Sequence, residues 1–120
     1  MEEVSVAFTE WEQKRCERDL KKFMAHRRPT LHVRPRLDLG FRIHGRSVEI
    51  FEMRPDWKEV GEAIETPVAI ATFVRNTSTW KLYWMRGDMK WHGYPPNPVL
   101  RDFSQAPAVV DRDEFGCFFG

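Results

Sequence analysis

The sequence contains few of the patterns from which metal or redox functions are usually inferred. Its 120 residues include only two cysteines, Cys16 and Cys117, which lie near opposite ends of the chain. There is no CxxC pair and no His-x3-His spacing, so we expect no structural metal site and no cofactor. The two thiols are expected to be free in a reducing compartment, although the sequence leaves a Cys16–Cys117 bridge open.

Long apolar segments are also missing. The longest uncharged apolar run, Pro67–Val74, is too short to cross a bilayer. The start of the chain, Met1–Val4, is acidic and lacks the basic flank and apolar stretch of a signal peptide. We therefore expect a cytoplasmic protein with no membrane partner.

Familiar catalytic motifs are absent as well. The chain has no glycine-rich phosphate loop, no GxSxG elbow and no HExxH helix, which favours binding over catalysis. The remaining alternative is a hydrolase or nuclease that uses Glu49, Glu52, Asp88 and His92 as acids and bases. Because Glu49 and Glu52 are three positions apart, a regular strand would place them on opposite faces.

What the sequence does contain is enough apolar material for one folded domain, residues 1–120. Hydrophobic residues make up 42% of the chain and five are tryptophans. The net charge is +1, but basic residues gather between Lys14 and Arg36 and acidic residues between Glu49 and Glu65. This asymmetry indicates either an anionic partner or packing of the two segments against each other.

The first predicted element is a helix that begins after Thr9. Thr9 and Glu12 have the spacing of a capping box, and Pro29 ends the helix near Arg27 or Arg28. Its predicted apolar stripe consists of Trp11, Cys16, Leu20, Phe23 and Met24. We expect residues 29–36, which include Pro29 and Pro35, to form an extended connector.

A hairpin is predicted next, with Gly45-Arg46 as its loop. This loop sets Ile43 opposite Val48 and Arg42 opposite Glu49, so an apolar pair and an ion pair support the same register. Further along, a bulge near Ile50-Phe51 is expected to turn every apolar residue of the second strand toward the core. Those residues are Val48, Ile50, Phe51 and Met53.

The second half of the chain predicts a central strand, Pro67–Val74, and then a hairpin within residues 80–94. With Gly87-Asp88 as a two-residue loop, Trp84 faces Trp91 on the core side. Residues 104–113 are expected to form a short helix, and the apolar tail 115–120 is expected to pack on the core. The predicted fold is therefore α+β: an N-terminal helix packed on a twisted antiparallel sheet of about five strands, with a short C-terminal helix and an apolar tail.

The outer face of the 80–94 hairpin is the candidate functional surface. In the predicted register Tyr83 faces His92 and Lys81 faces Tyr94, which suits stacking on bases and contact with phosphates. The candidate binding residues are Lys81, Tyr83, Arg86, Lys90, His92, Tyr94 and Arg75. We therefore expect a non-enzymatic module for single-stranded nucleic acid, unless the N-terminal helix covers this face. The alternative is a protein-interaction or homodimer module that uses a sheet edge and the Phe118-Phe119 tail.

Several stretches together resemble a known family. They are Leu37–Ile43, Ser47–Pro55, Tyr83–Arg86, Lys90–His92 with Tyr94, and Asp113–Gly120. This combination is similar to a small bacterial family of domains of unknown function, number 3024 in that series. The resemblance implies a single-domain protein with no assigned activity, so it transfers no catalytic residue to this chain.

Overall fold

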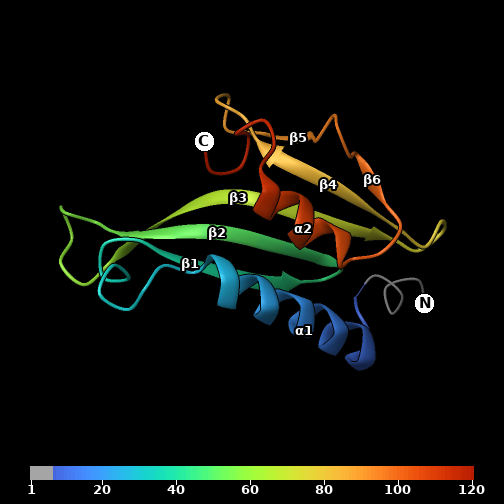
Figure 1. The fold of residues 1–120 in the computed structure, drawn as a ribbon, viewed down its shortest axis with the longest axis horizontal. Coiled ribbons are helices and arrows are strands. Elements are labelled where there is room, and N and C mark those ends of the chain that lie inside the picture. The colour runs from blue at the N-terminus through green and yellow to red at the C-terminus, as the bar shows by residue number, and fades with distance from the viewer. Residues whose placement is uncertain (1–6) are drawn as a thin grey trace.

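Two helices pack on the same face of an antiparallel sheet in the computed structural model, which describes residues 7–120 (Figure 1). The elements follow the order α1 (Glu10–Arg27), β1 (Asp38–His44), β2 (Ser47–Pro55), β3 (Ala63–Val74), β4 (Thr79–Met85), β5 (Trp91–Gly93), β6 (Val99–Leu100) and α2 (Gln105–Arg112). The strands are ordered β1-β2-β3-β4-β5 across the sheet, and β6 also pairs with β4. The predicted α+β architecture is confirmed; the acidic segment Met1–Val4 lies outside the described residues.

The boundaries of α1 follow from its caps. The Thr9 amide donates to Glu12 Oε1 at 2.9 Å and the Glu12 amide donates to Thr9 Oγ1 at 3.1 Å, which is the predicted capping box. At the other end the helix stops at Arg27, two residues before Pro29.

The predicted apolar stripe of α1 is wrong at one position. Cys16, Leu20 and Phe23 are buried, but Trp11 is 67% exposed. At 3.6 residues per turn, five positions rotate a side chain by about 140°, so Trp11 and Cys16 do not share a face. Trp11 therefore lies outside the buried face of α1 and is largely exposed to solvent.

The connector between α1 and β1 is folded into turns, so the predicted extended conformation is wrong. The Val33 amide donates to the Thr30 carbonyl at 2.9 Å, and the Leu37 amide donates to the Val33 carbonyl at 3.1 Å. The flanking prolines do not prevent this, because the φ of proline is compatible with turns as well as with extended backbone.

The β1–β2 hairpin has the predicted register. Ile43 pairs with Val48 and Arg42 with Glu49, and Gly45 takes a φ of +61° in the loop. The two-residue loop and the alternation of side chains were therefore sufficient to predict this register.

The predicted bulge occurs at Ile50/Phe51, but it does not do what was expected. It lies in the β2–β3 pairing, where Val68 of β3 is the additional residue, while β1 and β2 stay in register. Phe51 therefore lies on the sheet face opposite to Ile50, and Met53 lies there with it. The expectation that the bulge would turn all four apolar residues toward one core is therefore wrong, although Phe51 itself is buried, at 6% exposed.

The core lies between the sheet and the two helices. From the sheet it takes Val48 and Ile50 of β2, Val68, Ala69 and Ala71 of β3, and Trp80 and Leu82 of β4. The C-terminal tail packs against it as predicted: Phe118 is 7% exposed, and its ring centroid lies 4.7 Å from that of Tyr94.

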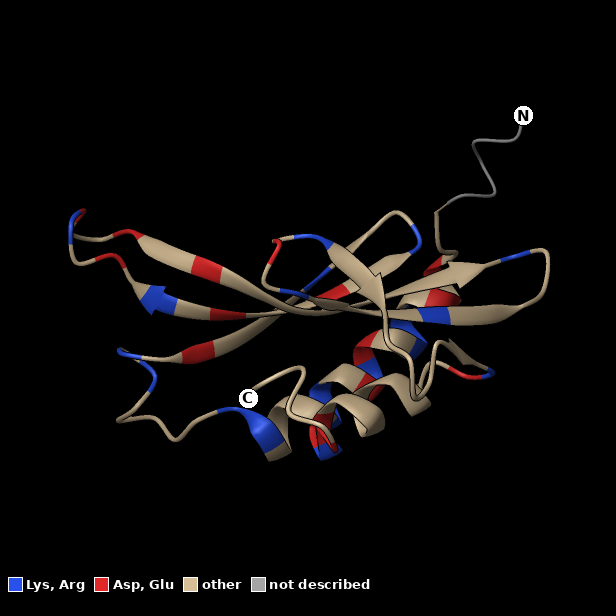
Figure 2. Cartoon of the chain, turned by 90° about the horizontal axis from the view of Figure 1, so that it is seen from above, with Lys and Arg blue, Asp and Glu red and all other residues tan. Residues whose placement is uncertain are grey.

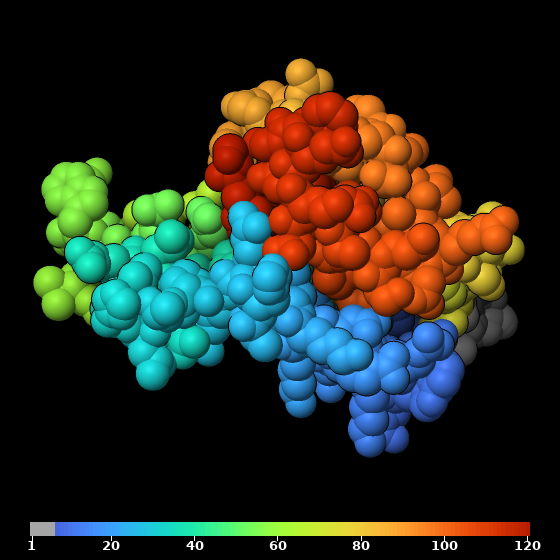
Figure 3. Space-filling model, in the orientation of Figure 1, coloured from blue at the N-terminus to red at the C-terminus, as the bar shows by residue number. Residues whose placement is uncertain are grey.

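Beyond Met53, β2 pairs with β3 alone and the two strands project from the body of the protein. We call this projection, residues 54–64, the arm; its yellow-green tip is visible at the left of Figure 3. Trp57 is 82% exposed and Val60 is fully exposed at this tip. Among residues 7–120, no helix has the length and apolar character needed to span a membrane.

Candidate binding sites

Both helices lie below the sheet in Figure 2 and leave its other side open. We call this side the open face. Strand alternation and the observed pairings place on it Gly40, Arg42, Ser47, Glu49, Phe51, Met53, Glu65, Ile70, Thr72, Lys81, Tyr83, Met85 and Trp91. The N-terminal helix therefore does not cover the face that carries Lys81 and Tyr83.

The β4–β5 hairpin differs from the predicted one by one residue. Its loop has three residues, Gly87 to Met89, and the Arg86 amide donates to the Lys90 carbonyl at 3.2 Å. Met89 takes a φ of +63°, which is the left-handed position expected at the end of a three-residue hairpin loop. The predicted two-residue loop is thus wrong.

This shift reverses the faces of the β5 side chains. Trp91 pairs with Met85 and lies on the open face, whereas His92 pairs with Trp84 on the helix side. His92 Nε2 lies 2.8 Å from Asp88 Oδ2, and this contact contributes most to holding the pKa of Asp88 below its usual value.

Of the predicted binding residues, Lys81 and Tyr83 lie on the open face. Tyr94 is only 1% exposed in the core, so it cannot stack on a ligand there. Lys90 is exposed and directly precedes Trp91 at the hairpin end. Tyr94 and His92 are therefore absent from the predicted binding face, and Trp91, which was not predicted there, lies on it.

The remaining two candidates contact the helix side of the protein. Arg75 donates to Glu12 Oε1 at 3.0 Å, which ties the turn after β3 to the start of α1. The Arg86 guanidinium lies 5.6 Å from the ring centroid of Trp84. Neither arginine joins Lys81 and Tyr83 on the open face.

The part of the open face formed by β4 and β5 is aromatic and basic. We call Lys81, Tyr83, Met85, Trp91 and Gly93 the aromatic half. Tyr83 and Trp91 are diagonal neighbours on adjacent strands, so their Cβ atoms are about 7–8 Å apart. Gly93 lies directly opposite Tyr83, and no atom of the described residues would lie within 4 Å of a methyl group placed on it. The aromatic half contains no carboxylate.

The other part of the open face is occupied by an ion cluster. Arg42 lies 2.7 Å from Glu65 and 3.6 Å from Glu49, and its guanidinium covers the ring of Phe51 at 4.4 Å. The hydrogen bond to Glu65 raises the pKa of Arg42. The glutamates of this cluster, Glu49 and Glu65, are thus held on β2 and β3 and are partly neutralised.

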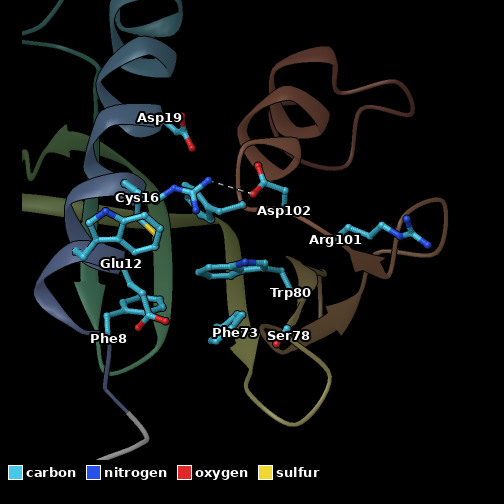
Figure 4. Close-up of a pocket in the computed structure, with 12 residues that line it drawn as sticks. Phe8, Glu12, Cys16, Asp19, Phe73, Ser78, Trp80, Arg101 and Asp102 are labelled. Carbon is cyan, nitrogen blue, oxygen red and sulfur yellow. Dashed lines mark ion pairs between the residues drawn. The ribbon is translucent and has the colours of Figure 1, made fainter.

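A cavity of about 200 Å³ lies on the helix side, between the first half of α1 and β4 (Figure 4). We call it the α1 pocket. Five aromatic rings line it: Phe8, Trp11, Phe73, Trp80 and Phe103. The Trp80 ring centroid lies 5.5 Å from that of Phe8, 5.1 Å from that of Phe73 and 4.9 Å from that of Phe103, so Trp80 is the centre of this cluster.

The charged residues of the α1 pocket are mainly acidic on the side of α1. Glu12 and Asp19 come from α1 and Asp102 from the segment before α2, where Arg15 reaches it at 3.6 Å. Cys16 is buried between them, and burial, followed by the charges of Asp19 and Glu12, raises its pKa to about 12.

The acid–base set proposed for hydrolysis is not brought together. Glu49 is on the open face, whereas Glu52 pairs with Leu39 on the helix side and contacts Arg54 at 3.8 Å. Asp88 and His92 contact each other at the hairpin loop, and none of the four lines the α1 pocket. Within residues 7–120, no group of three or more His, Cys, Asp or Glu side chains is placed to hold a metal ion.

The α1 pocket and the position of Trp91 on the open face were not predicted from the sequence. The pocket had one signal in the sequence: helical geometry rotates Trp11 away from the buried stripe, and a tryptophan at the edge of a buried helix face often lines a surface pocket. The position of Trp91 could be predicted only with the correct length of the hairpin loop, because that length decides on which face of the sheet each β5 side chain lies.

Comparison with known proteins places the chain within a family. A family model described as a domain of unknown function matches residues 8–120, nearly the whole chain. No curated protein and no solved structure matches it.

Proposed function

Since the chain belongs to the DUF3024 family, whose description assigns no activity, we propose its function from the open face: a non-enzymatic module that binds single-stranded nucleic acid. One observation carries this proposal. Both helices pack on the opposite side of the sheet and leave the aromatic half, with Tyr83 and Trp91, uncovered (Figure 2).

The aromatic half offers the two interactions that such binding needs. The rings of Tyr83 and Trp91 are half-buried, hence fixed at their base, and each can stack on a base for about 1–3 kcal/mol. Because these rings lie on adjacent strands, they can serve two different bases. The lack of side-chain hydrogen-bonding groups between them favours binding with little sequence preference.

Electrostatics supports the same placement. Exposed Lys81 and Lys90 lie at the two ends of the aromatic half and can neutralise phosphates. The glutamates of the open face, Glu49 and Glu65, are engaged by Arg42 on the neighbouring strands, and Asp38 at the start of β1 is engaged by Arg28. A phosphate backbone would therefore follow β4 and β5, away from the acidic groups.

The protein-interaction or homodimer alternative keeps one of its two surfaces. β1 is the end strand of the sheet and retains an outer edge. The Phe118-Phe119 tail is not available for it, because Phe118 is buried and the ring of Phe119 lies 4.1 Å from the Arg27 guanidinium.

The test is fluorescence anisotropy of labelled single-stranded RNA and DNA, titrated at low and high salt. We expect micromolar or tighter binding that weakens as salt rises. Replacement of Tyr83 or Trp91 by Ala should weaken binding by about 5- to 150-fold, the factor that corresponds to one lost stacking contact. No binding at low salt would rule out the proposal.

A sharper variant is Gly93→Glu, which places a carboxylate beside Tyr83 where the structure has open space. Its matched control is Gly87→Glu in the hairpin loop, where a side chain would also meet no described atom. We expect Gly93→Glu to abolish binding and Gly87→Glu to reduce it only slightly. Equal losses would show that net charge, and not the aromatic half, governs binding.

A further inference from the structure

One aromatic residue of the α1 pocket lies largely outside the core. Trp11 is 67% exposed on α1, yet it lies beside a cavity whose other walls are the rings around Trp80. Trp11 belongs neither to the buried core nor to the apolar residues that pack against that core. Its position instead completes an aromatic wall on the solvent side of the pocket.

Three carboxylates and two arginines surround these rings. Glu12 and Asp102 are ion-paired with Arg75 and Arg15. Asp19, whose contact with Arg18 is 3.7 Å long, is therefore the carboxylate best placed to attract a cation. Figure 4 shows Asp19 at the upper end of the pocket, Glu12 at its lower end, and Trp80 between them. The guanidinium of Arg101, in contrast, points away from the cavity. The raised pKa of Cys16 agrees with this arrangement, because after burial its next causes are the negative charges of Asp19 and Glu12.

The chain already places one cation in this setting. The Arg15 guanidinium lies 4.9 Å from the ring centroid of Trp11 and 3.6 Å from the Asp102 carboxylate. It is half-exposed and does not itself fill the cavity of about 200 Å³. The combination of ring faces and carboxylates is how proteins recognise alkylated ammonium groups.

We propose that the α1 pocket binds an organic ammonium cation with an apolar body, held by the rings of Trp11 and Trp80 and by the Asp19 carboxylate. The pocket lies on the helix side of the sheet, so this binding is independent of the open face. Asp19 suits the role because its own ion pair, to the neighbouring Arg18, is long at 3.7 Å.

The experiment uses choline as the probe and its uncharged carbon isostere, 3,3-dimethylbutan-1-ol, as the control ligand. Binding is followed in the full chain through the NMR signals of the five tryptophan indole N–H groups. We expect choline to shift the signals of Trp11 and Trp80 in a saturable way, while Trp57, on the arm, does not move. The isostere should produce no comparable shift.

Three variants connect the signal to the proposed contacts. Trp11→Ala should weaken choline binding by about 3- to 30-fold, the factor for one lost cation–π contact, whereas Trp57→Ala should not change it. Asp19→Asn should weaken binding, whereas Glu17→Gln should not, because Glu17 does not line the pocket. Arg15→Gln should strengthen binding, because it removes a competing cation from the ring of Trp11.

Each opposite result overturns the proposal. Equal binding of choline and the isostere would indicate an apolar pocket without selection for charge. Binding of benzoate in place of choline, weakened by Arg15→Gln, would indicate an anion site. An absence of indole shifts with choline would show that the pocket does not bind ammonium cations, and nucleic-acid binding on the open face would be unaffected by any of these outcomes.

Discussion

At the scale of single residues, the two cysteines show how burial controls chemistry. Cys16 is 2% exposed within α1, and burial is the main reason that its pKa rises to about 12. Cys117 is half-buried in the C-terminal tail, and burial also raises its pKa above the usual value. Both are free thiols, so the bridge that the sequence left open is not formed.

We predict that an alkylating reagent such as iodoacetamide distinguishes these two thiols. At about pH 8, where an ordinary thiol is partly ionised, Cys117 should react slowly and Cys16 should not react until the protein is unfolded. Mass spectrometry of the intact chain should therefore show one modification in the native state and two in denaturant. A Cys117→Ser variant that is still labelled when native would contradict this prediction.

At the scale of elements, the pairing of β1 and β2 depends on a glycine covered by an aromatic ring. A methyl group on Gly40 would lie 2.8 Å from Cε2 of Phe51, so the ring occupies the place of a side chain. Arg42 covers the other side of that ring. Phe51 and Arg42 thus cover the backbone at Gly40 on the face of the sheet that no helix covers.

We predict that Gly40→Ala lowers the free energy of unfolding by about 1–3 kcal/mol, the usual cost of overpacking. Gly93→Ala is the matched control, because it lies in a strand with open space above it and should change stability little. Urea denaturation followed by circular dichroism measures both. On a Gly40→Ala background, Phe51→Leu should recover part of the loss; equal stability of the two alanine variants would refute the steric explanation.

Elements were predictable from sequence where local signals decide them. The capping residues Thr9 and Glu12 and the Gly45-Arg46 loop each act over a few residues, and both predictions are confirmed. The β4–β5 register was not predictable in the same way. It depends on Met89 adopting a φ of +63° and on the Lys90 amide donating to Asp88 at 3.0 Å, features that a search for a two-residue glycine loop overlooks.

At the scale of the whole molecule, α1 is fastened to the rest of the chain by ion pairs at several points. Glu12 holds Arg75 of the β3–β4 turn, and Arg28 donates to both oxygens of Asp38 at 2.8 Å. Hydrogen bonding from Arg75 lowers the pKa of Glu12, and that from Arg28 lowers the pKa of Asp38. Both carboxylates are therefore more acidic in the folded protein than in the unfolded chain.

We predict that acid weakens this attachment. A carboxyl group with a lowered folded pKa stabilises the fold above its unfolded pKa, and this stabilisation is lost as pH falls through the folded value. Stability should thus be complete above the ordinary pKa values, 4.5 for Glu12 and 3.8 for Asp38, and decrease progressively below them. Urea unfolding at a series of pH values measures this decrease in the free energy of unfolding.

The variant Asp38→Asn tests the ion pair with Arg28. It should be less stable than the wild type at neutral pH, and its free energy of unfolding should decrease less on acidification. If its free energy of unfolding decreased with pH as steeply as that of the wild type, this ion pair would be excluded as a cause.

The face that the helices cover is the part of the architecture that the sequence did not decide. Both faces carry large apolar residues, for example Trp80 and Leu82 on one and Phe51, Ile70 and Trp91 on the other. Alternation assigns residues to two faces but does not say which face the helices cover. That choice depends on contacts with α1 and α2, which are distant in sequence.

The arm offers a different use of this geometry. Its tip, residues 56–62, stands clear of the open face and of the α1 pocket, and its side chains are turned into solvent (Figure 3). Exposed tips of this kind tolerate inserted sequence well, since few packed groups constrain them. A purification tag, a reporter domain or a tethering peptide spliced into this tip would leave both candidate surfaces facing outward, which makes the arm a natural handle for immobilising the protein.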